Sequence, residues 1–553
     1  MNWQLSNRWS WLAFVGCLLA EFLLFDRTTS AHHAWVYPRW NDQIQYLTEA
    51  YTGYEKLRND GVLNGLRSAL VNPSAQGTMH DFYALCVFTL AGPSRSAALS
   101  VNMLAFIVWQ AVLFAALVRR TGSHGLAWAS AGLLLALHAP WSGNPGSAVD
   151  FRLDHMAMCS AGICISIALL CDGLRSTTWS ATLGLAIGVT LVTRFLTGAY
   201  FALGFLATGL LLLSGTQPAR RLANLILAGA IAALVAGPVF WLNREWVWNY
   251  YFIGHFTGPE SAIRSPNMDF WKSTEFVWGN LYRVQLGPVL FALAGVLLLG
   301  SVGMRWLARR EPELATTGRQ DRDWLASGLI ATLCPAAVLT LHAQKSELVL
   351  GIISPGVIVL FCWLAVRIAG KAADGSAMSA LGIFALGVMV YLGGAAHFIR
   401  SSIADPHPAE FVSSARTVNR VADLIWRTAI ANQLAAPRIG VDQVTDCLDA
   451  QVMRVVCYER HHVWVPFVMT LPTGIMAEKE SLLRGRLADS DFVLLTDEMT
   501  GEGGWPYDRQ MRLLYPQFKQ WCDANLRKVE SISLFGRKMS LYQRMAISSK
   551  VSE

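Results

Sequence analysis

Up to residue 398, the chain alternates long uncharged apolar runs with short charged connections. A helix needs about 20 apolar residues to cross about 30 Å of hydrocarbon, and most of the runs reach that length. They recur too often to be the buried cores of a soluble protein, so we predict eleven membrane spans. The runs without Asp, Glu, Lys or Arg are 9–20, 96–118, 126–149, 155–171, 176–193, 195–219, 222–243, 284–304, 324–344, 348–366 and 375–398. A further apolar segment, 82–91, is too short to span and is predicted to re-enter the membrane or to lie in its interface.

Basic residues in the short connections predict the orientation of the spans. With the N-terminus in the cytoplasm, the basic groups that fall inside are Arg8, Arg119–Arg120, Arg175, Arg220–Arg221, the cluster within 305–322, and Arg367 with Lys371. The tail then lies outside, which is the periplasm if this is the inner membrane of a Gram-negative bacterium. The alternative for the first run is a cleaved signal peptide with 29–31 as its small-residue site. Glu21 within that run is a functional candidate, because an acid inside a membrane is costly.

The tail has the composition of a soluble fold. In residues 400–553, 37 of 154 residues are charged, against 46 of 399 in the rest of the chain. Its pattern predicts a helix over 416–434, buried strands at 438–441 and 492–496, and a terminal hairpin whose strands 531–535 and 539–542 flank a Gly-Arg turn. We therefore predict an α-helical polytopic membrane domain, 1–398, followed by a small α/β domain, 399–553.

Composition and motifs narrow the class of protein. The chain is 53% hydrophobic and only 15% charged, which excludes a disordered or collagen-like protein and disfavours an ordinary cytosolic enzyme. It contains no CxxC, HExxH, GxGxxG or Walker A pattern, so neither a strong zinc motif nor a nucleotide-driven transporter is indicated. Much of the net charge of +7 comes from basic residues in the predicted inner connections, so it does not indicate a nucleic-acid partner. An oxidising compartment would permit Cys447 and Cys457 to pair, although their spacing alone does not establish a disulfide.

Polar residues gather at the predicted outer ends of the spans. Asp42 precedes an amphipathic stretch, 45–70, which suits a juxtamembrane helix on the outer surface. Asp42 is then either the N-cap of that helix or a functional carboxylate. The second outer loop places four polar residues directly before the fourth span: Asp150, Arg152, Asp154 and His155. Charges at a membrane boundary are costly unless paired or solvated. These residues therefore form an ion pair with an N-cap, or Arg152 holds a carboxylate against a cationic or metal-bound group.

Two further outer segments mix aromatic and charged residues. The third contains Tyr250, Tyr251, His255, Glu260, Arg264 and Lys272. Its aromatic residues either form an interface belt or line a sugar site in which Arg264 meets a phosphate. The fourth runs from His342 to Lys345 and precedes a span that contains Pro355. Lys345 either snorkels at the boundary or binds a phosphate as a point charge, and Pro355 would kink its helix.

These features together resemble the GT-C class of membrane glycosyltransferases, which includes protein O-mannosyltransferases and RgtA-like bacterial enzymes. The residues that carry the resemblance are Asp42 and Tyr46 in the first outer loop, Asp150, Arg152 and Asp154 in the second, and Lys345 with Pro355 at the late span, followed by a soluble tail. The resemblance covers roughly residues 1–398 and lies mostly in the layout of spans and loops.

The resemblance implies transfer of a sugar from a polyprenyl-phosphate donor to a glycan, lipid or protein acceptor on the outer face of the membrane, with inversion of the anomeric carbon. Asp42 is the implied general base. Asp154 would orient the acceptor or, with Asp42, bind a divalent cation. Positive charge must meet the departing lipid phosphate, and the candidates are Lys345, Arg264 and Arg152. Candidate substrate-binding residues are Tyr46, Asp150, His155, Tyr251, His255, Glu260 and His342.

Other classes of protein remain open alternatives. A secondary transporter often shows two matching halves and broken helices near the midplane, but this sequence shows no such match, and its polar residues cluster in outer loops. A lipid-linked glycan polymerase or ligase would share the donor chemistry. An assembly protein would use its outer domain to bind a partner, although eleven spans are far more than an anchor needs.

Overall fold

The computed structural model describes most of the chain, in segments separated by short gaps. The described residues are 3–36, 41–71, 74, 76–143, 146–213, 216–257, 268–308, 320–342, 345–369, 377–403, 409–434, 437–442, 448, 450–462, 468–471, 479–497, 506–534 and 537–545. The chain divides into two compact units. Unit 1 comprises Met1–Thr29, Asp60–Leu90 and Ala97–Asp405, and unit 2 comprises Ser30–Asn59, Ala91–Ser96 and Pro406–Glu553.

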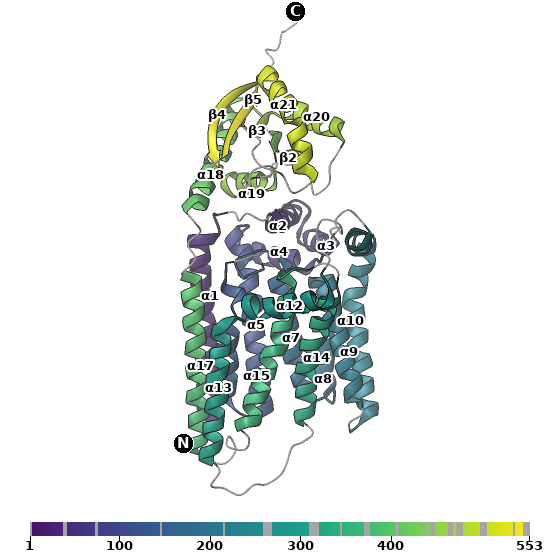
Figure 1. The fold of residues 1–553 in the computed structure, drawn as a ribbon, viewed down its shortest axis with the longest axis vertical. Coiled ribbons are helices and arrows are strands. Elements are labelled where there is room, and N and C mark those ends of the chain that lie inside the picture. Colours follow the sequence, from purple (N-terminus) through teal and green to yellow (C-terminus); the bar gives the residue numbers. More distant parts are fainter. Residues whose placement is uncertain are drawn as a thin grey trace, which may run out of the picture. The chain divides into compact units, whose positions relative to one another are not determined.

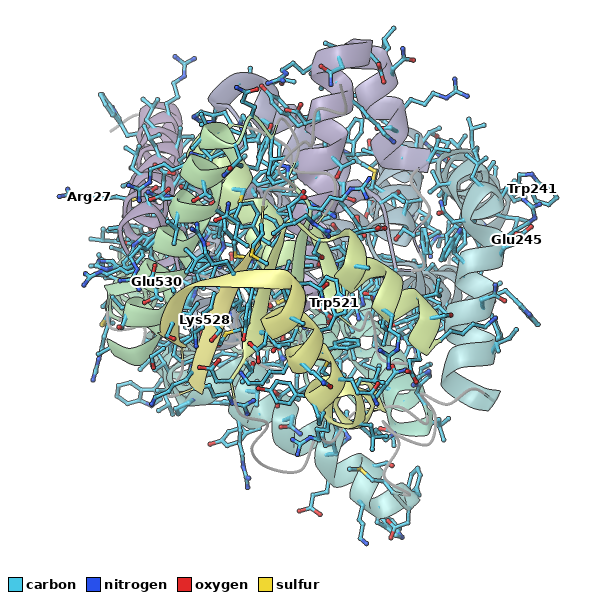
Figure 2. All side chains as sticks on the ribbon, turned by 90° about the horizontal axis from the view of Figure 1, so that it is seen from above. Arg27, Trp241, Glu245, Trp521, Lys528 and Glu530 are labelled. Carbon is cyan, nitrogen blue, oxygen red and sulfur yellow. The ribbon has the colours of Figure 1, made fainter. Side chains whose placement is uncertain are left out.

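Unit 1 is a bundle of long helices that run side by side, with the short helix α12 lying across them (Figure 1). Its α-helices are α1 (Trp3–Thr28), α3 (Val62–Val71), α4 (Met79–Ala91), α5 (Arg95–Thr121), α6 (His124–Leu135), α7 (Leu153–Leu170), α8 (Thr177–Thr193), α9 (Phe195–Leu212), α10 (Pro218–Val247), α12 (Phe270–Asn280), α13 (Gly287–Ala308), α14 (Gln320–Leu341), α15 (Ser354–Ala369) and α17 (Ala377–Ile403). Its shorter helical turns are η2 (Ala139–Trp141), η3 (Trp248–Thr257), η4 (Leu281–Leu286) and η5 (Leu348–Ile353), whereas η1 (Thr29–His33) lies mostly in unit 2. At the edge of the bundle, Trp241 and Glu245 point away from α10 (Figure 2), as expected for a lipid- and water-facing surface.

Every predicted span contains a helix, and the chain is a multi-pass membrane protein. Within the described residues, nine helices are long and apolar enough to cross a membrane. The third and fifth predicted spans contain the shorter helices α6, of 12 residues, and α8, of 17 residues. The third run contains no charge over 126–149, but its helix ends at Leu135 and a 3-10 turn containing Pro140 follows. Proline has no backbone N–H to continue a helix, so the uncharged run overestimates the length of the helix in this span.

Glycines let α6 and α17 approach each other closely. A Cβ on Gly387 would overlap the carbonyl oxygen of Gly125, and one on Gly394 would overlap that of Gly132. Both pairs are seven residues apart along their helices, so they lie on one face. Without a hydrophobic drive between helices in lipid, small residues that permit close packing stabilise association. The α6–α17 contact therefore depends on these four positions.

Gly394→Leu is expected to destabilise unit 1 by about 1–3 kcal/mol, because overpacking forces the backbones apart. The measurement is the thermal unfolding midpoint in detergent micelles. Gly229→Leu on α10 is the matched control, since nothing lies within 4 Å of a Cβ at that position. Equal midpoints for the two variants would contradict the close-packing role of Gly394.

Unit 2 contains a mixed five-stranded sheet in the order β2-β1-β3-β5-β4. Strands β1 (Ile439–Asp442), β2 (Val468–Leu471) and β3 (Phe492–Thr496) are parallel to one another. Strand β5 (Arg537–Arg544) runs antiparallel both to β3 and to β4 (Leu526–Leu534). The predicted strands at 438–441 and 492–496 and the terminal hairpin are confirmed, although β4 begins at Leu526 rather than 531. All five residues of β3 are buried.

Within its described residues, unit 2 has five α-helices. They are α2 (Asn41–Asp60), α18 (Ala409–Ala431), α19 (Ala450–His461), α20 (Glu480–Asp489) and α21 (Pro506–Asn525). Helix α18 contains most of the helix predicted over 416–434. Cys457 is buried on α19, but Cys447 lies outside the described residues, so a disulfide between them stays a prediction.

The segment between the first two spans was only partly predicted. Residues 45–70 form two helices, α2 and α3, rather than one. Gly61 separates them with φ +91°, a left-handed conformation that glycine adopts without a steric penalty. Residues 30–59 also group with the tail as part of unit 2, whereas the sequence pattern places them with the membrane domain.

Candidate functional site

The loop before α7, predicted to be the second outer loop, folds into a buried charged cluster at the start of this helix. Asp150 and Arg152 form an ion pair, one of the two alternatives left open by the sequence, with 3.1 Å between Asp150 Oδ2 and Arg152 Nε. The same carboxylate oxygen accepts a hydrogen bond from the backbone N–H of Gly146 at 2.5 Å. Both side chains are about 95% buried. The N-cap of α7 is Arg152 without a side-chain capping bond, so neither acid in this loop is the N-cap.

Asp154, in the first turn of α7, is held by an arginine that sequence reasoning missed. Arg194 Nη1 lies 2.7 Å from Asp154 Oδ1, and the two side chains are 16% and 5% exposed. Arg194 is the junction of α8 and α9. In the sequence it is the single charge between two long uncharged runs, 176–193 and 195–219. A lone arginine so placed could have been identified as a partner for a membrane-boundary acid.

Hydrogen bonds to backbone groups hold the loop before α7 and the α8–α9 junction in unit 1. Asn102 on α5 donates from Nδ2 to the carbonyl oxygens of Ala148 and Asp150, at 3.1 and 2.9 Å. At the α8–α9 junction, Thr78 N donates to Val192 O at 2.9 Å, and Phe195 N donates to Gln76 O at 2.9 Å. Asn102 and the 76–78 segment therefore set the geometry of the loop and of the junction that carries Arg194.

Two histidines are buried in the same region. His80 packs its ring against Phe151 with centroids 3.9 Å apart. Burial lowers the pKa of His80 to about 3, although a hydrogen bond with Asn102 opposes the shift. This histidine is therefore neutral at physiological pH and adds no positive charge to the cluster. His155 on α7 is 1% exposed and lies beside Cys159, with 3.5 Å between Nε2 and Sγ.

Lys345 is placed at the C-terminal end of α14. Its ammonium donates to three carbonyl oxygens of the last turn: those of Leu339 at 3.1 Å, Thr340 at 2.6 Å and His342 at 2.6 Å. A lysine has three donors, and a cation is favourable at a helix C-terminus. Burial lowers the pKa of Lys345. Lys345 thus caps α14 in this conformation, and it must release some of these carbonyls before it can bind a phosphate.

The third outer segment is described only in part. Tyr251 on η3 is 7% exposed and packs with Val192 and Phe195 at the α8–α9 junction. Its neighbour Tyr250 accepts a hydrogen bond at its hydroxyl from Gln76 Nε2 at 3.1 Å. Glu260, Arg264 and the side chain of His255 lie outside the described residues, so their roles stay predictions.

The remaining candidates, Asp42 and Tyr46, lie on α2 in unit 2. Helix α2 begins at Asn41, so Asp42 lies in its first turn and not in the capping position before it. Its side chain is exposed, whereas Tyr46 is 8% exposed. The Asp150–Arg152 and Asp154–Arg194 pairs belong instead to unit 1.

A buried arginine holds the start of α2. Arg95 is 2% exposed. Its Nε and Nη2 donate to Gln43 Oε1 at 3.1 and 2.5 Å, and its Nη1 donates to His33 O at 2.5 Å and to Val36 O. Because Gln43 is the residue after Asp42, the guanidinium fixes the first turn of α2 against the chain that precedes it. Sequence reasoning missed Arg95, which by pattern is only the charged residue directly before the span 96–118.

The metal-ligating side chains among the described residues do not form a metal site. Among the residues that the structure describes, no three His, Cys, Asp or Glu side chains come together so that they could hold a metal ion. Asp154 already engages Arg194, and the Asp150 carboxylate engages Arg152 and Gly146 N. The carboxylates of this cluster are thus committed to cationic and N–H partners, and we assign no ion to it.

Comparison with known proteins shows the fold. No family model matches the chain, and no curated protein matches it. ArnT from Cupriavidus metallidurans bound to undecaprenyl phosphate has 15% sequence identity and a TM-score of 0.56, covering 97% of this chain and 98% of that one. The same protein in the apo state gives 15% and 0.55, covering 98% of both chains. An Archaeoglobus fulgidus oligosaccharyltransferase in complex with Zn and sulfate gives 12% and 0.46, covering 87% of this chain and 68% of that one. The likeness to ArnT confirms the predicted GT-C-like fold.

Proposed function

We propose that this protein is a membrane glycosyltransferase that moves a sugar from a polyprenyl-phosphate donor to an acceptor hydroxyl at the outer face of a bacterial inner membrane. The observation that carries the proposal is the fold shared, over nearly the whole of both chains, with an ArnT that binds undecaprenyl phosphate. The acceptor is a glycan, a lipid or a protein of the cell envelope. In this proposal the spans are oriented with the N-terminus in the cytoplasm and unit 2 in the periplasm.

The reaction needs a base for the acceptor hydroxyl, and Asp42 is our candidate. An exposed carboxylate in the first turn of a helix is accessible to a substrate and lies at the favourable end of the helix dipole. It would take the hydroxyl proton as the acceptor oxygen attacks the anomeric carbon. The bond from that carbon to the phosphate oxygen breaks as the new bond forms, polyprenyl phosphate leaves with the electron pair, and this single displacement inverts the configuration.

The departing lipid phosphate needs positive charge. We propose Lys345 and Arg264 for this role. Arg152 is a weaker candidate, because Asp150 already neutralises it within a buried pair. The Asp154–Arg194 pair has a supporting role in this proposal: it holds the loop before α7 to the α8–α9 junction, and Asp154 orients the acceptor.

Transfer can be tested directly in proteoliposomes. The purified protein is incubated with a polyprenyl phosphate that carries a radiolabelled sugar and with a cell-envelope extract as acceptor. We expect the label to enter a new product while free polyprenyl phosphate accumulates in equal amount. A protein that moved labelled solute across the sealed vesicles and formed no glycosylated product would instead be a transporter.

Lys345→Met tests whether the ammonium binds donor as well as capping α14. Methionine keeps the apolar stem and removes the charge. We expect the donor KM to rise about tenfold, since a charge-assisted hydrogen bond contributes about 1.5–3 kcal/mol, with a smaller fall in kcat. Initial rates at varied donor concentration provide the measurement. If the unfolding midpoint falls but the donor KM is unchanged, Lys345 acts only as a helix cap.

A further inference from the structure

Helix α2 is joined to α19 by two crossed hydrogen bonds between tyrosine and glutamate. Tyr51 on α2 donates from its hydroxyl to Glu459 Oε1 on α19 at 2.5 Å. Tyr458 on α19 donates to Glu55 Oε1 on α2 at 2.7 Å. The two tyrosine rings also pack on each other, with centroids 5.0 Å apart. Each helix therefore gives one donor and one acceptor, and we call these four residues the crossed pairs.

The two tyrosines of the crossed pairs are buried, and the two glutamates are partly buried. Tyr51 is fully buried and Tyr458 is 2% exposed. On α2, Ile44, Leu47 and Ala50 are also fully buried. Burial and the hydrogen bond to Glu55 raise the pKa of Tyr458, so its hydroxyl stays a donor at physiological pH. Tyrosine–carboxylate bonds shielded from water in this way are stronger than they would be at an exposed surface.

The directional hydrogen bonds of the crossed pairs fix the rotation of α2 about its own axis. Apolar contact is non-directional, so it tolerates rotation of α2 about its own axis. Two hydrogen bonds from residues four positions apart, Tyr51 and Glu55, share one face of the helix and set its rotation. Asp42 lies nine residues before Tyr51, about 14 Å along the same helix at about 1.5 Å per residue. A change in the rotation of α2 at the crossed pairs therefore changes the direction in which Asp42 points.

We propose that the C-terminal part of unit 2 is a positioning element for the transfer reaction. In this proposal, α19 sets the rotation of α2, and so the aim of Asp42, through the crossed pairs. Tyr51, Glu55, Tyr458 and Glu459 are positioning residues, and Arg95 holds the other end of the arrangement at Gln43. This inference rests on the proposed function of Asp42 as the base.

The kinetic test separates positioning from binding. In the proteoliposome assay, we expect Tyr51→Phe and Glu459→Leu each to lower kcat about tenfold, because a misplaced base stabilises the transition state less. The donor KM should stay within about twofold, because a misdirected base affects the transition state and not the bound donor. Glu459→Gln keeps an acceptor oxygen, so it should recover most of the rate. Tyr458→Phe provides an independent variant of the second pair if Glu459→Leu fails to fold.

Hydrogen exchange supplies a readout that does not depend on activity. In the full-length protein, Tyr51→Phe should speed amide exchange in residues 43–50 about tenfold relative to the unchanged chain. Glu530→Gln is the matched control, because Glu530 pairs at 2.9 Å with Arg420 inside unit 2 but does not contact α2 through that pair. Glu530 lies on β4 (Figure 2). This control should change neither the exchange in α2 nor kcat.

The outcomes distinguish the inference from the proposed function. An active unchanged chain whose Tyr51→Phe and Glu459→Leu variants keep full kcat would overturn the inference and leave the proposed function standing. Equal rate losses in Glu459→Gln and Glu459→Leu would overturn it as well. An inactive unchanged chain would overturn the proposed function and, with it, the positioning of Asp42 for transfer.

Discussion

Asp42→Asn is expected to lower kcat for sugar transfer by about 10²- to 10⁴-fold, the usual contribution of a general base. The amide has nearly the same size and shape as the carboxylate but cannot take the acceptor proton. Asp42 is exposed, so the change should leave the unfolding midpoint of the protein within about 1 °C, since surface substitutions change stability little. The measurement is the initial rate of labelled product formation in proteoliposomes.

The same helix provides a control for that variant. Asp60 is the last residue of α2 and is also exposed. Asp60→Asn makes the identical chemical change about 27 Å away along the axis, at about 1.5 Å per residue, and should transfer sugar at the unchanged rate. Full activity of Asp42→Asn, or equal losses in both variants, would remove the assignment of Asp42 as the base.

Asp154→Asn is expected to produce the largest loss of stability. It leaves the Arg194 guanidinium, which is 16% exposed, without its carboxylate. Breaking a buried ion pair on one side costs about 3–5 kcal/mol, because an uncompensated charge remains. The free energy of unfolding in mixed micelles is the measurement. Adding Arg194→Gln to Asp154→Asn should restore much of the loss, since the stranded charge is then removed.

An exposed pair in the same unit gives the comparison for Asp154. Arg175 and Asp172 lie 3.5 Å apart, and their side chains are 26% and 43% exposed. Such pairs contribute about 0–1 kcal/mol, so Asp172→Asn should be nearly neutral. A loss in Asp154→Asn as small as that in Asp172→Asn would show that water reaches the Asp154–Arg194 pair.

The helices of the bundle were predictable because an uncharged apolar run can be recognised from consecutive residues alone. Each of the eleven runs contains a helix, and the hydrophobic β3 strand and the terminal hairpin were found where the pattern placed them. The errors arose where backbone chemistry interrupts an apolar or amphipathic run. Gly61 divides the predicted outer helix into α2 and α3, and a turn at Pro140 follows the early end of α6.

The candidate site was less predictable because its contacts join distant parts of the chain. The loop before α7 was expected either to form an ion pair with an N-cap or to hold a functional carboxylate, and the structure shows a pair between Asp150 and Arg152, only two residues apart. Asp154 and Arg194 are forty positions apart and meet only because the α8–α9 junction reaches the start of α7. Lys345 illustrates another limit, since a boundary lysine gives no sign in the sequence that its three donors cap α14.

Unit 2 is assembled from segments that lie far apart in the chain, so its parts are synthesised at different times. Tyr51 is synthesised 408 residues before Glu459, its hydrogen-bond partner. At about 5–20 residues per second, α2 emerges on the order of 20–80 s before α19 exists. During that interval Tyr51, which is fully buried in the folded protein, has neither Glu459 to bond to nor the Tyr458 ring to pack on. A chain released before α19 is made would lack these partners for α2, so α2 would be a recognition signal for chaperones and proteases that act on unfinished copies.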